Sequence, residues 1–421
     1  MKMSAENLDL LAQSAEEALA PLFSEIDRTA EKNTARVMEA FCRHKVSATH
    51  FASTDGYGYD DAGREVLEKV WADVFGCEAA LVRPSILCGT HALTIGLFGL
   101  LRPGQILLSV TGRPYDTLGD VIGLSGQSGC GSLRDFGVDY DEVPLRDGAP
   151  DMPAILDKLK ELGERVGVIF IQRSKGYLDR VSLTADEIGE MIARIRTVND
   201  KAFVMVYNCY GEFVCDKEPS AVGADLTVGS LIKNPGGGMA ETGGYLCGTK
   251  RAVELCAYRY AAPGLGGEVG ASLGQNKPMI KGLFYAPHTV AQALKTAHLA
   301  AALFSRMGFR TNPAWDERRA DIIQAVHCGT PERLIAFIRG IQHGSAIDAY
   351  LTCEPWDMPG YNDPVIMAAG AFTMGSSIEL SADGPVRPPY IAYLQGGLTY
   401  ESGKYAILSA AREVQNALSK S

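Results

Sequence analysis

The sequence predicts an α/β protein with a large, mostly parallel three-layer domain, a smaller C-terminal α+β domain and an N-terminal helical arm. Short apolar segments alternate with amphipathic helical segments between about residues 64 and 206, which is typical of a parallel sheet covered by helices. A helical pattern precedes this region, and shorter strand and helix patterns follow it. We expect the arm to span residues 1–50, the large domain 51–290 and the small domain 291–421.

The arm is predicted from apolar residues that recur every three or four positions, as on one face of one or two helices. Residues 51–64 follow, where glycine and tyrosine occur without any period, so we expect a loop. Its side chains Tyr57, Tyr59 and Arg64 could reach a ligand anion. Alternatively, the tyrosines pack at a contact between subunits.

The large domain follows from alternating patterns. The predicted helices are 64–76, 88–101, 115–124, 152–162 and 184–198, and the predicted strands are 79–82, 105–110, 138–143, 166–171 and 202–206. Because these strands are apolar along most of their length, both faces of the sheet should be covered. Ligands of such sheets bind at the carboxyl ends of the strands, where this chain has polar clusters at 111–116, 172–177, 207–212 and 230–233.

The remainder of the chain is predicted to be mainly helical from Lys250 to about Gly308, and then mixed. The small domain would combine strands at 349–352, 376–380 and 390–394 with helices at 330–341 and 403–418. We see no internal repeat that would suggest another architecture.

Composition excludes several classes of function. The net charge of −10 and the pI of about 5.3 argue against a nucleic-acid partner. No long uncharged apolar run indicates a membrane span, and ten cysteines without a C-x-x-C pair are typical of buried thiols in a reducing, cytoplasmic compartment. The histidines show no spacing that would indicate a metal site.

One stretch organises the chain: an apolar run ends in Ser230, and a single lysine, Lys233, precedes Asn-Pro-Gly-Gly-Gly. The proline and glycines predict turns and close backbone approach. A lysine held there suits a Schiff base with an aldehyde cofactor, and pyridoxal 5′-phosphate (PLP) is the obvious one. The alternative is a sharp loop with a surface lysine. Lys175 is a rival candidate, but no glycine-rich segment follows it.

Two further sites concern anions. Gly89 and Thr90 open an apolar helix, whose free N–H groups could bind a phosphate, although Thr90 could instead be a plain N-cap. Prolines around Arg387 would fix its guanidinium, which could bind a carboxylate through two parallel hydrogen bonds. A structural ion pair is the alternative for Arg387.

Longer motifs support this interpretation. They are Gly56-Tyr-Gly-Tyr-Asp-Asp, Pro114-Tyr-Asp-Thr-Leu, Asn208-Cys-Tyr-Gly-Glu-Phe-Val, Gly229-Ser-Leu-Ile-Lys-Asn-Pro-Gly-Gly-Gly, Glu354-Pro-Trp-Asp-Met-Pro-Gly-Tyr and Tyr393-Leu-Gln-Gly-Gly-Leu-Thr-Tyr. Together they resemble the methionine γ-lyase-like, or aluminium-resistance, proteins. Those proteins belong to the fold-type I PLP-dependent enzymes of cysteine and methionine metabolism. The resemblance covers nearly the whole chain from about residue 50.

The resemblance implies specific catalytic roles. Lys233 would carry PLP as a Schiff base and, once released by the substrate, would move protons as a base. Tyr115 would stack on the pyridine ring and assist departure of the leaving group. Arg387 would bind the α-carboxylate of the substrate.

The resemblance also implies how the phosphate is bound. Gly89, Thr90 and Ser230 would form the phosphate site within one subunit. Tyr57 or Tyr59 would reach the phosphate of a neighbouring subunit, so a homodimer or homotetramer with shared active sites is expected.

One position departs from the family pattern, which has Val-Asp-Asn where this chain has Val206-Tyr207-Asn208. The aspartate pairs with the pyridine nitrogen, whereas a phenol, with an ordinary pKa of about 10, only donates or accepts a hydrogen bond. The electron sink should therefore be weaker. The chain could be a specialised enzyme, could relocate the contact to Asn208 or Glu212, or could be impaired. We count Tyr207 and Asn208 among the cofactor-binding residues and expect a retained but altered activity.

The leading functional hypothesis is a PLP-dependent lyase that eliminates a β- or γ-substituent, a thiol or a halide, from an L-amino acid. A variant of it forms an unsaturated or alkynyl amino acid. The alternatives are a PLP-dependent racemase and a PLP-binding protein without turnover.

Overall fold

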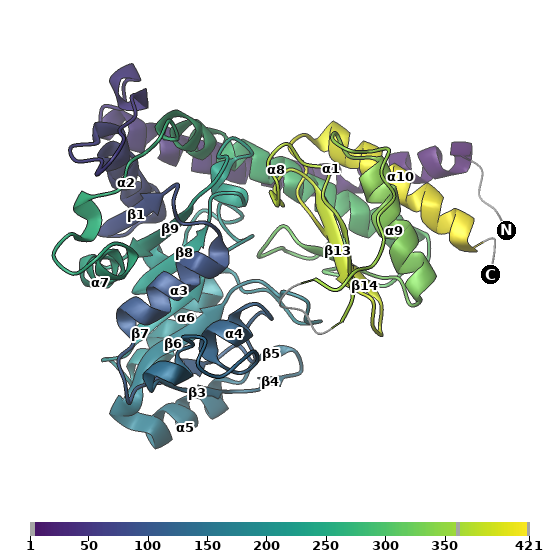
Figure 1. The fold of residues 1–421 in the computed structure, drawn as a ribbon. Helices are drawn as coiled ribbons and strands as arrows, with labels where there is room; N and C mark the ends of the chain where they lie inside the picture. The colour runs from purple at the N-terminus through teal and green to yellow at the C-terminus, as the bar shows by residue number, and fades with distance from the viewer. Residues whose placement is uncertain (1–4, 359–362, 419–421) are drawn as a thin grey trace.

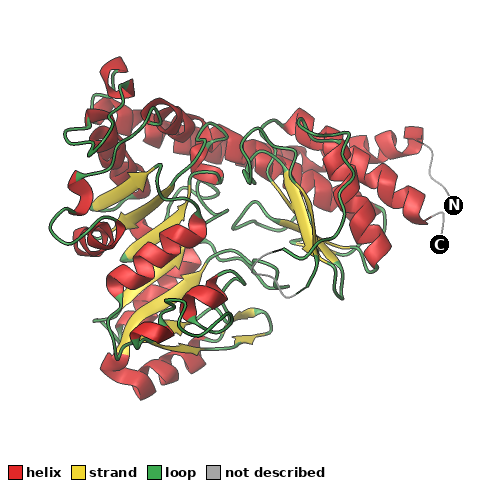
Figure 2. Cartoon of the chain, in the orientation of Figure 1, coloured by secondary structure: helices red, strands yellow, loops and turns green. Residues whose placement is uncertain are grey.

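The computed structural model describes residues 5–358 and 363–418, in which two sheets lie side by side and are connected by long helices (Figures 1 and 2). The larger sheet has the strand order β1-β9-β8-β7-β6-β2-β3. Its strands are β1 (Ala79–Arg83), β2 (Ile106–Ser109), β3 (Asp139–Glu142), β6 (Val166–Gln172), β7 (Phe203–Tyr207), β8 (Leu226–Ser230) and β9 (Gly244–Gly248). Strands β3, β2, β6, β7 and β8 are parallel, and β9 and β1 continue the sheet in antiparallel fashion.

Helices cover both faces of this sheet. They are α2 (Ala62–Phe75), α3 (Gly89–Leu100), α4 (Leu118–Ile122), α5 (Met152–Leu162), α6 (Ala185–Arg196) and α7 (Lys250–Tyr260), and a short hairpin of β4 (Leu145–Arg146) and β5 (Ala149–Pro150) lies nearby. Helices α3 and α7 pack on one face, and α2, α5 and α6 pack on the other. Strand β6 is buried along its whole length, as its continuous apolar sequence predicts.

The smaller sheet is antiparallel, with the strand order β10-β11-β14-β13-β12. Its strands are β10 (Thr311–Asn312), β11 (Gln324–His327), β12 (Val365–Ala368), β13 (Ser381–Pro385) and β14 (Ile391–Gln395). Helices α9 (Pro331–His343) and α10 (Tyr400–Leu418) pack against it.

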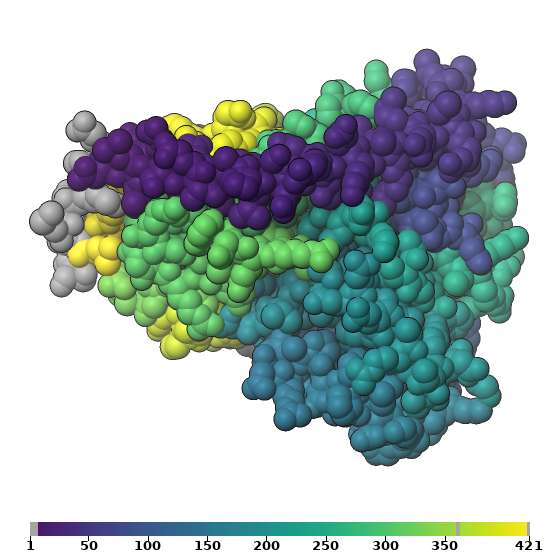
Figure 3. Space-filling view, turned by 180° about the vertical axis from the view of Figure 1, so that it is seen from behind, coloured from purple at the N-terminus to yellow at the C-terminus, as the bar shows by residue number. Residues whose placement is uncertain are grey.

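Two long helices, α1 (Ala5–Arg43) and α8 (Asn276–Arg306), run beside both sheets (Figure 1). Figure 3 shows α1, in purple, crossing one face of the molecule from end to end. Its residue Leu8 is part of the small-domain core, whereas Val37 lies in the core of the large domain. The expected domain boundary at residue 290 falls inside α8, because this helix also contributes to both cores.

Several expectations about local structure are wrong. The helix predicted at 115–124 shortens to α4, and the segments 349–352 and 376–380 are loops and turns rather than strands. The strand β13 has the sequence Ser-Ala-Asp-Gly-Pro, which is poor in residues that favour strands, and it forms because it pairs with a neighbour on both sides. Part of the motif at 354–361 lies outside the described residues.

Candidate active site

A cavity of about 210 Å³ lies where the carboxyl ends of the large sheet meet the small sheet. The residues that line it are Cys88, Gly89, Thr90, Tyr115, Thr117, Gln172, Ser174, Gly176, Tyr177, Tyr207, Cys209, Tyr210, Ser230, Ile232, Lys233, Ile323, Asp383 and Gln395. Six predicted site residues of the large domain are therefore brought together: Lys233, Tyr115, Gly89, Thr90, Ser230 and Tyr207.

Lys233 points into this cavity, which excludes the alternative of a surface lysine. Its Nζ donates a hydrogen bond of 2.5 Å to Ser377 Oγ and lies 4.9 Å from the ring centroid of Tyr210. Burial alone lowers the pKa of Lys233, but the neighbouring Tyr210, Cys209 and Asp383 outweigh it and leave the pKa above its ordinary value. In this state the amine is an ammonium ion.

The glycines after Lys233 hold it by close backbone packing. A Cβ at Gly236 would lie 1.7 Å from Leu231 O, so no other residue fits there. Gly237 has φ +55°, and a Cβ on it would lie 2.4 Å from the carbonyl oxygen of Gly282 in α8. The loop is thus pressed against α8, which fixes the position of the lysine.

Helix α3 begins at Gly89 in the wall of the cavity, and no side chain caps it. Thr90 is inside the helix and its Oγ1 lies 3.0 Å from Thr117 Oγ1, so it is not the N-cap. Gly89, Thr90 and Ser230 line the same cavity as Lys233. An uncapped helix N-terminus, which can bind a phosphate, and a lysine amine in one cavity form the donor set that PLP requires, so these residues fit that cofactor.

Tyr115 and Tyr177 form an aromatic wall of the cavity, with ring centroids 6.0 Å apart in an edge-to-face arrangement. The backbone N–H of Tyr115 donates to Gln172 Oε1 at 2.7 Å, which anchors the start of this loop to β6. Tyr115 is therefore placed where it could contact a flat ligand.

Tyr207 ends β7 and reaches the start of α3, since a Cβ at Gly89 would lie 2.6 Å from its hydroxyl oxygen. Burial raises the pKa of Tyr207 well above its ordinary value, and the adjacent thiol of Cys209, with which it shares a hydrogen bond, raises it further. Tyr207 is therefore a neutral phenol that can donate a hydrogen bond but carries no charge.

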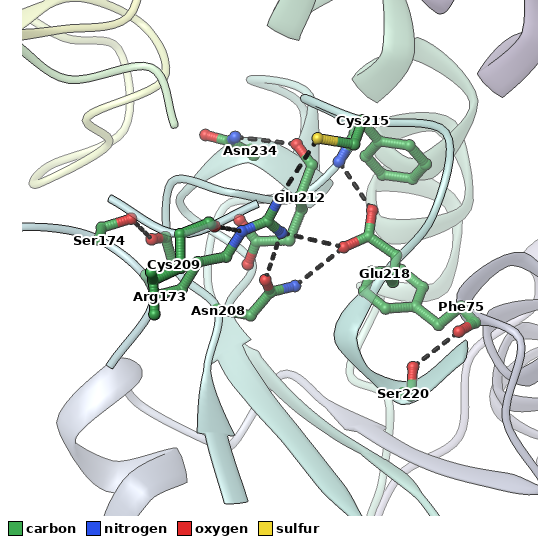
Figure 4. A network of polar contacts seen from close by, with 12 residues as sticks. Phe75, Arg173, Ser174, Asn208, Cys209, Glu212, Cys215, Glu218, Ser220 and Asn234 are labelled. Atoms are coloured by element: carbon green, nitrogen blue, oxygen red, sulfur yellow. Dashed lines mark hydrogen bonds and ion pairs between the residues drawn. The ribbon is translucent and has the colours of Figure 1, made fainter. Parts of the chain in front are cut away.

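Asn208 does not line the cavity, contrary to its expected role in binding the cofactor. Figure 4 shows its side chain between Arg173 and Glu218, and all three residues are buried. It accepts from Arg173 Nη1 at 2.7 Å and donates to Glu218 Oε2 at 3.1 Å. The reason is the geometry of a β-strand, in which successive side chains point to opposite faces of the sheet. Of the two neighbours Tyr207 and Asn208, only Tyr207 faces the cavity.

Glu212 belongs to the same network and is fully buried. Its Oε1 accepts from the Tyr245 hydroxyl at 2.8 Å, and burial raises the pKa of Glu212 to about 8. The relocated contact through Asn208 or Glu212 therefore has no support, because neither residue lines the cavity.

The loop containing Tyr57 and Tyr59 lies outside this chain's cavity. The two rings stack with centroids 5.4 Å apart, and they are 68% and 54% exposed. Arg64, in contrast, is buried and donates to the carbonyl oxygens of Gly58 and Gly270, at 2.6 and 2.9 Å. It therefore holds the loop in shape and does not bind a ligand anion.

Arg387 lies beside the cavity and is not among the residues that line it. Its Nη1 is 2.6 Å from Asp363 Oδ2, so the alternative of an ion pair is realised in this state. Arg387 is also close enough to Asp116 to oppose the burial that raises the pKa of that carboxyl. Because Asp116 follows Tyr115, the guanidinium lies near the cavity wall.

Lys175, the rival for Schiff-base formation, does not line the cavity. Its Nζ donates to the carbonyl and side-chain oxygens of Asn312, both at 3.1 Å, and burial lowers its pKa to about 8. It connects the two domains as a structural residue.

Sequence reasoning missed the contributions of the small domain, Ser377, Asp383 and Gln395. Asp383 was visible as an isolated acid in a Gly-Pro segment, but its burial depends on the strand pairing of β13. Sequence reasoning also missed Cys209 as a residue of the cavity. It assigned all ten cysteines to buried positions, although Cys42 and Cys130 are exposed.

Two negative findings concern residues 5–358 and 363–418. No group of three or more histidine, cysteine, aspartate or glutamate side chains is arranged to bind a metal ion. None of the helices in these ranges has an apolar stretch long enough to cross a lipid bilayer.

Comparison with known proteins places this geometry in context. The model of the methionine gamma-lyase family matches residues 8–415. An uncharacterized protein of Bacillus subtilis, YnbB, is 52% identical over 406 residues, which is 96% of each chain. The solved structure of a carbon-sulfur lyase involved in aluminium resistance from Clostridium novyi has a TM-score of 0.93 at 47% identity, covering 97% of this chain and 96% of that one.

A more distant structure extends the likeness of fold. The pyridoxal-5′-phosphate dependent protein YhfS from Escherichia coli has a TM-score of 0.62 at 16% identity and covers 94% of this chain and 97% of that one. At this identity the likeness concerns the fold alone. The comparisons confirm the resemblance drawn from the motifs and the predicted fold class, fold type I.

Glu212 gives a prediction about stability and pH. Its folded pKa of about 8 exceeds the value of about 4.3 for an unfolded chain, so the folded protein holds a proton that the unfolded chain releases. The stabilising contribution is complete below about pH 4 and is lost as pH rises to about 8, with a slope of at most about 1.4 kcal/mol per pH unit. Glu212→Gln should therefore lose less stability than the parent between pH 5 and pH 8 in urea unfolding. Glu161→Gln, at an exposed glutamate, is the control. Parallel curves for Glu212→Gln and the parent would contradict the assignment.

Proposed function

The chain belongs to the methionine gamma-lyase family, and from that premise we propose that it is a PLP-dependent lyase that removes a β- or γ-substituent from an L-amino acid. A carbon–sulfur bond is the first candidate for cleavage, and a carbon–halogen bond is the second. The observation that carries the proposal is the position of the Lys233 amine in one cavity with the helix N-terminus at Gly89.

PLP, when bound, supplies an electron sink for the carbon next to the substrate amine. The first-turn N–H groups of α3, with Thr90 and Ser230, would bind its phosphate, and Lys233 would hold its aldehyde carbon. The cofactor would lie against the wall formed by Tyr115.

Lys233 would also move the protons. After the substrate replaces it, its free amine can take a proton from the α-carbon, and γ-elimination requires a second transfer from the β-carbon. Ser377 and Tyr210 contact the amine and would keep it aimed into the cavity. The hydroxyl of Tyr115 would protonate the departing group.

Arg387 would bind the α-carboxylate of the substrate. A carboxylate and a guanidinium form two parallel hydrogen bonds, and the incoming group would take the place of Asp363. Binding would thus exchange one ion pair for another at the edge of the cavity.

Tyr207 favours a second candidate function. A neutral phenol at the end of β7 would not stabilise a protonated cofactor nitrogen as a carboxylate would. Proton transfer at the α-carbon alone needs less electron withdrawal than γ-elimination. Racemisation of an amino acid is the second candidate. Formation of an unsaturated or alkynyl amino acid is a variant of the first.

Replacement of Lys233 tests the main proposal. Lys233→Ala should lose the covalent link to PLP, measured as the mass added to the protein after borohydride reduction, and should reduce turnover at least about 100-fold because the proton carrier is lost. Lys175→Met, at the rival lysine, should keep the added mass. Products from amino acids with β- or γ-leaving groups are identified by mass spectrometry. A ketoacid or an unsaturated amino acid supports elimination, whereas the D-isomer alone supports racemisation; a covalent PLP adduct retained in Lys233→Ala contradicts both.

Replacement of Tyr207 tests the altered electron sink. Tyr207→Asp should change the absorption spectrum and either the rate or the ratio of elimination to racemisation, while the cofactor stays bound, because a carboxylate can stabilise a protonated pyridine nitrogen. Tyr207→Phe removes only the hydroxyl and is the control. A Tyr207→Asp protein identical to the parent in spectrum and in every kinetic constant would refute this role.

We also propose that the active form is a homodimer, or a homotetramer built from dimers, with shared sites. The support is the loop of Tyr57 and Tyr59, which presents two exposed, stacked rings. Hydrogen bonds from the buried Arg64 hold this loop in place. Asp61 caps α2 and accepts hydrogen bonds from Thr54 and Asn276, so the loop is ordered without a partner. A rigid aromatic pair of this kind is well suited to an interface.

Mixing two impaired variants tests the sharing of sites. The double variant Tyr57→Ala, Tyr59→Ala should bind PLP more weakly and lose activity at limiting PLP, and Lys233→Ala should be inactive. A mixed dimer would contain one site with the lysine of one subunit and the tyrosines of the other, so refolding the variants together should restore up to about a quarter of the parental activity per site, with a dimer or tetramer mass in light scattering. No recovery on mixing, or a fully active monomer, would contradict the proposal.

A further inference from the structure

Asp383 supplies a carboxylate to the cavity from the domain opposite Lys233. It lies in β13, where it pairs with Met367 of β12 and Tyr393 of β14. Among the described residues that line the cavity, Asp383 is the only one with a carboxylate. The two domains therefore place an acid and an amine on facing walls of one small space.

The Asp383 carboxylate is held in place but is incompletely paired. The side chains of Tyr177 and Gln395 hydrogen-bond to it. Its Oδ1 is buried, and it accepts no hydrogen bond from any residue in the described part of the chain. The amine of Lys233 does not fill this position, because it donates to Ser377 Oγ.

Other polar side chains of the cavity wall are already engaged. Gln172 accepts from the N–H of Tyr115 and donates to Ser174 O at 3.0 Å. Gln395 accepts from Ser381 at 2.9 Å. A buried carboxylate oxygen without a donor costs free energy that a bound donor would recover, so Asp383 is the open acceptor of the cavity.

We propose that Asp383 is the receptor for an ammonium group of the amino-acid substrate. This inference rests on the proposed function, because it assumes that the cavity binds an amino acid. An ammonium ion is the substrate group that matches a fixed, buried carboxylate by both charge and hydrogen bonding. In the proposed function the α-amine of the substrate replaces Lys233 on the cofactor, so it is not the group that Asp383 binds. The group is a distal ammonium at the end of the substrate's side chain.

The charge of Asp383 fits this role at neutral pH. Burial raises its pKa to about 6, while Lys233, Tyr177 and Gln395 oppose the rise, so the group is ionised at pH 7 and becomes neutral below about pH 6. The pKa values of its neighbours Lys233 and Tyr393 lie above their ordinary values, so neither group titrates between pH 5 and pH 7. Across the cavity edge, Asp116 and the pair of Arg387 with Asp363 act on a substrate carboxylate instead.

Three compounds without a leaving group separate ammonium binding by Asp383 from catalysis: L-norleucine, L-ornithine and hexanoate. Norleucine has only the α-ammonium, ornithine has an ammonium where norleucine has its terminal methyl, and hexanoate has no ammonium. Their dissociation constants are measured by calorimetry on the PLP-loaded parent, on Asp383→Asn, which conserves volume, and on the control Asp179→Asn. Asp179 is a carboxylate outside the cavity that pairs with Arg310.

Asp383→Asn should weaken ornithine binding about tenfold or more and leave norleucine and hexanoate within about twofold of the parent, while Asp179→Asn should match the parent for all three compounds. The inference is overturned if ornithine binds to Asp383→Asn within about twofold of the parent, or if norleucine or hexanoate weakens to the same extent as ornithine. Because no elimination is involved, these outcomes stand whether or not the lyase assay succeeds.

A measurement on the parent protein covers the case in which Asp383→Asn does not fold. The affinity for ornithine should fall relative to that for norleucine as the pH is lowered from 7 to 5, because the carboxylate of Asp383 becomes neutral. An unchanged ratio over this range would overturn the inference without any variant.

Discussion

The contact between the glycine-rich loop and α8 is the constraint on which the site depends. At Gly236, Gly237 and Gly282 the two backbones approach more closely than any side chain allows. Since α8 is part of both cores, this contact sets the position of Lys233 relative to the small-domain sheet as well as the large one. The amine thereby meets Ser377, a residue 144 positions later in the chain.

The end of β7 separates the cavity from a buried network of charged side chains. Tyr207 faces the cavity as a neutral phenol, while Asn208, the next residue, joins Arg173 and Glu218 on the other side. The buried network stabilises the turn that follows the strand and leaves the cavity with few charges. Lys233 and Asp383 therefore act in surroundings where water screens them weakly.

The sequence allowed the large domain and half of the site to be predicted because both depend on local patterns. Apolar runs such as 166–171 are long enough to indicate strands, and the lysine before three glycines is a signal in itself. Asn208 was misplaced because a motif names neighbouring residues without saying which face each occupies. Asp383 and Ser377 were missed as site residues because long-range contacts, which propensity does not encode, bring them near Lys233. These contacts are strand pairing for Asp383 and the packing of a turn for Ser377.

The helices α1 and α8 have a mechanical consequence. Each contributes one end to each hydrophobic core, so a rotation of one sheet against the other would shear both helices out of their packing. The two helices therefore hold the two domains in one relative orientation. The packing of these two helices therefore sets the separation of the walls that carry Lys233 and Asp383.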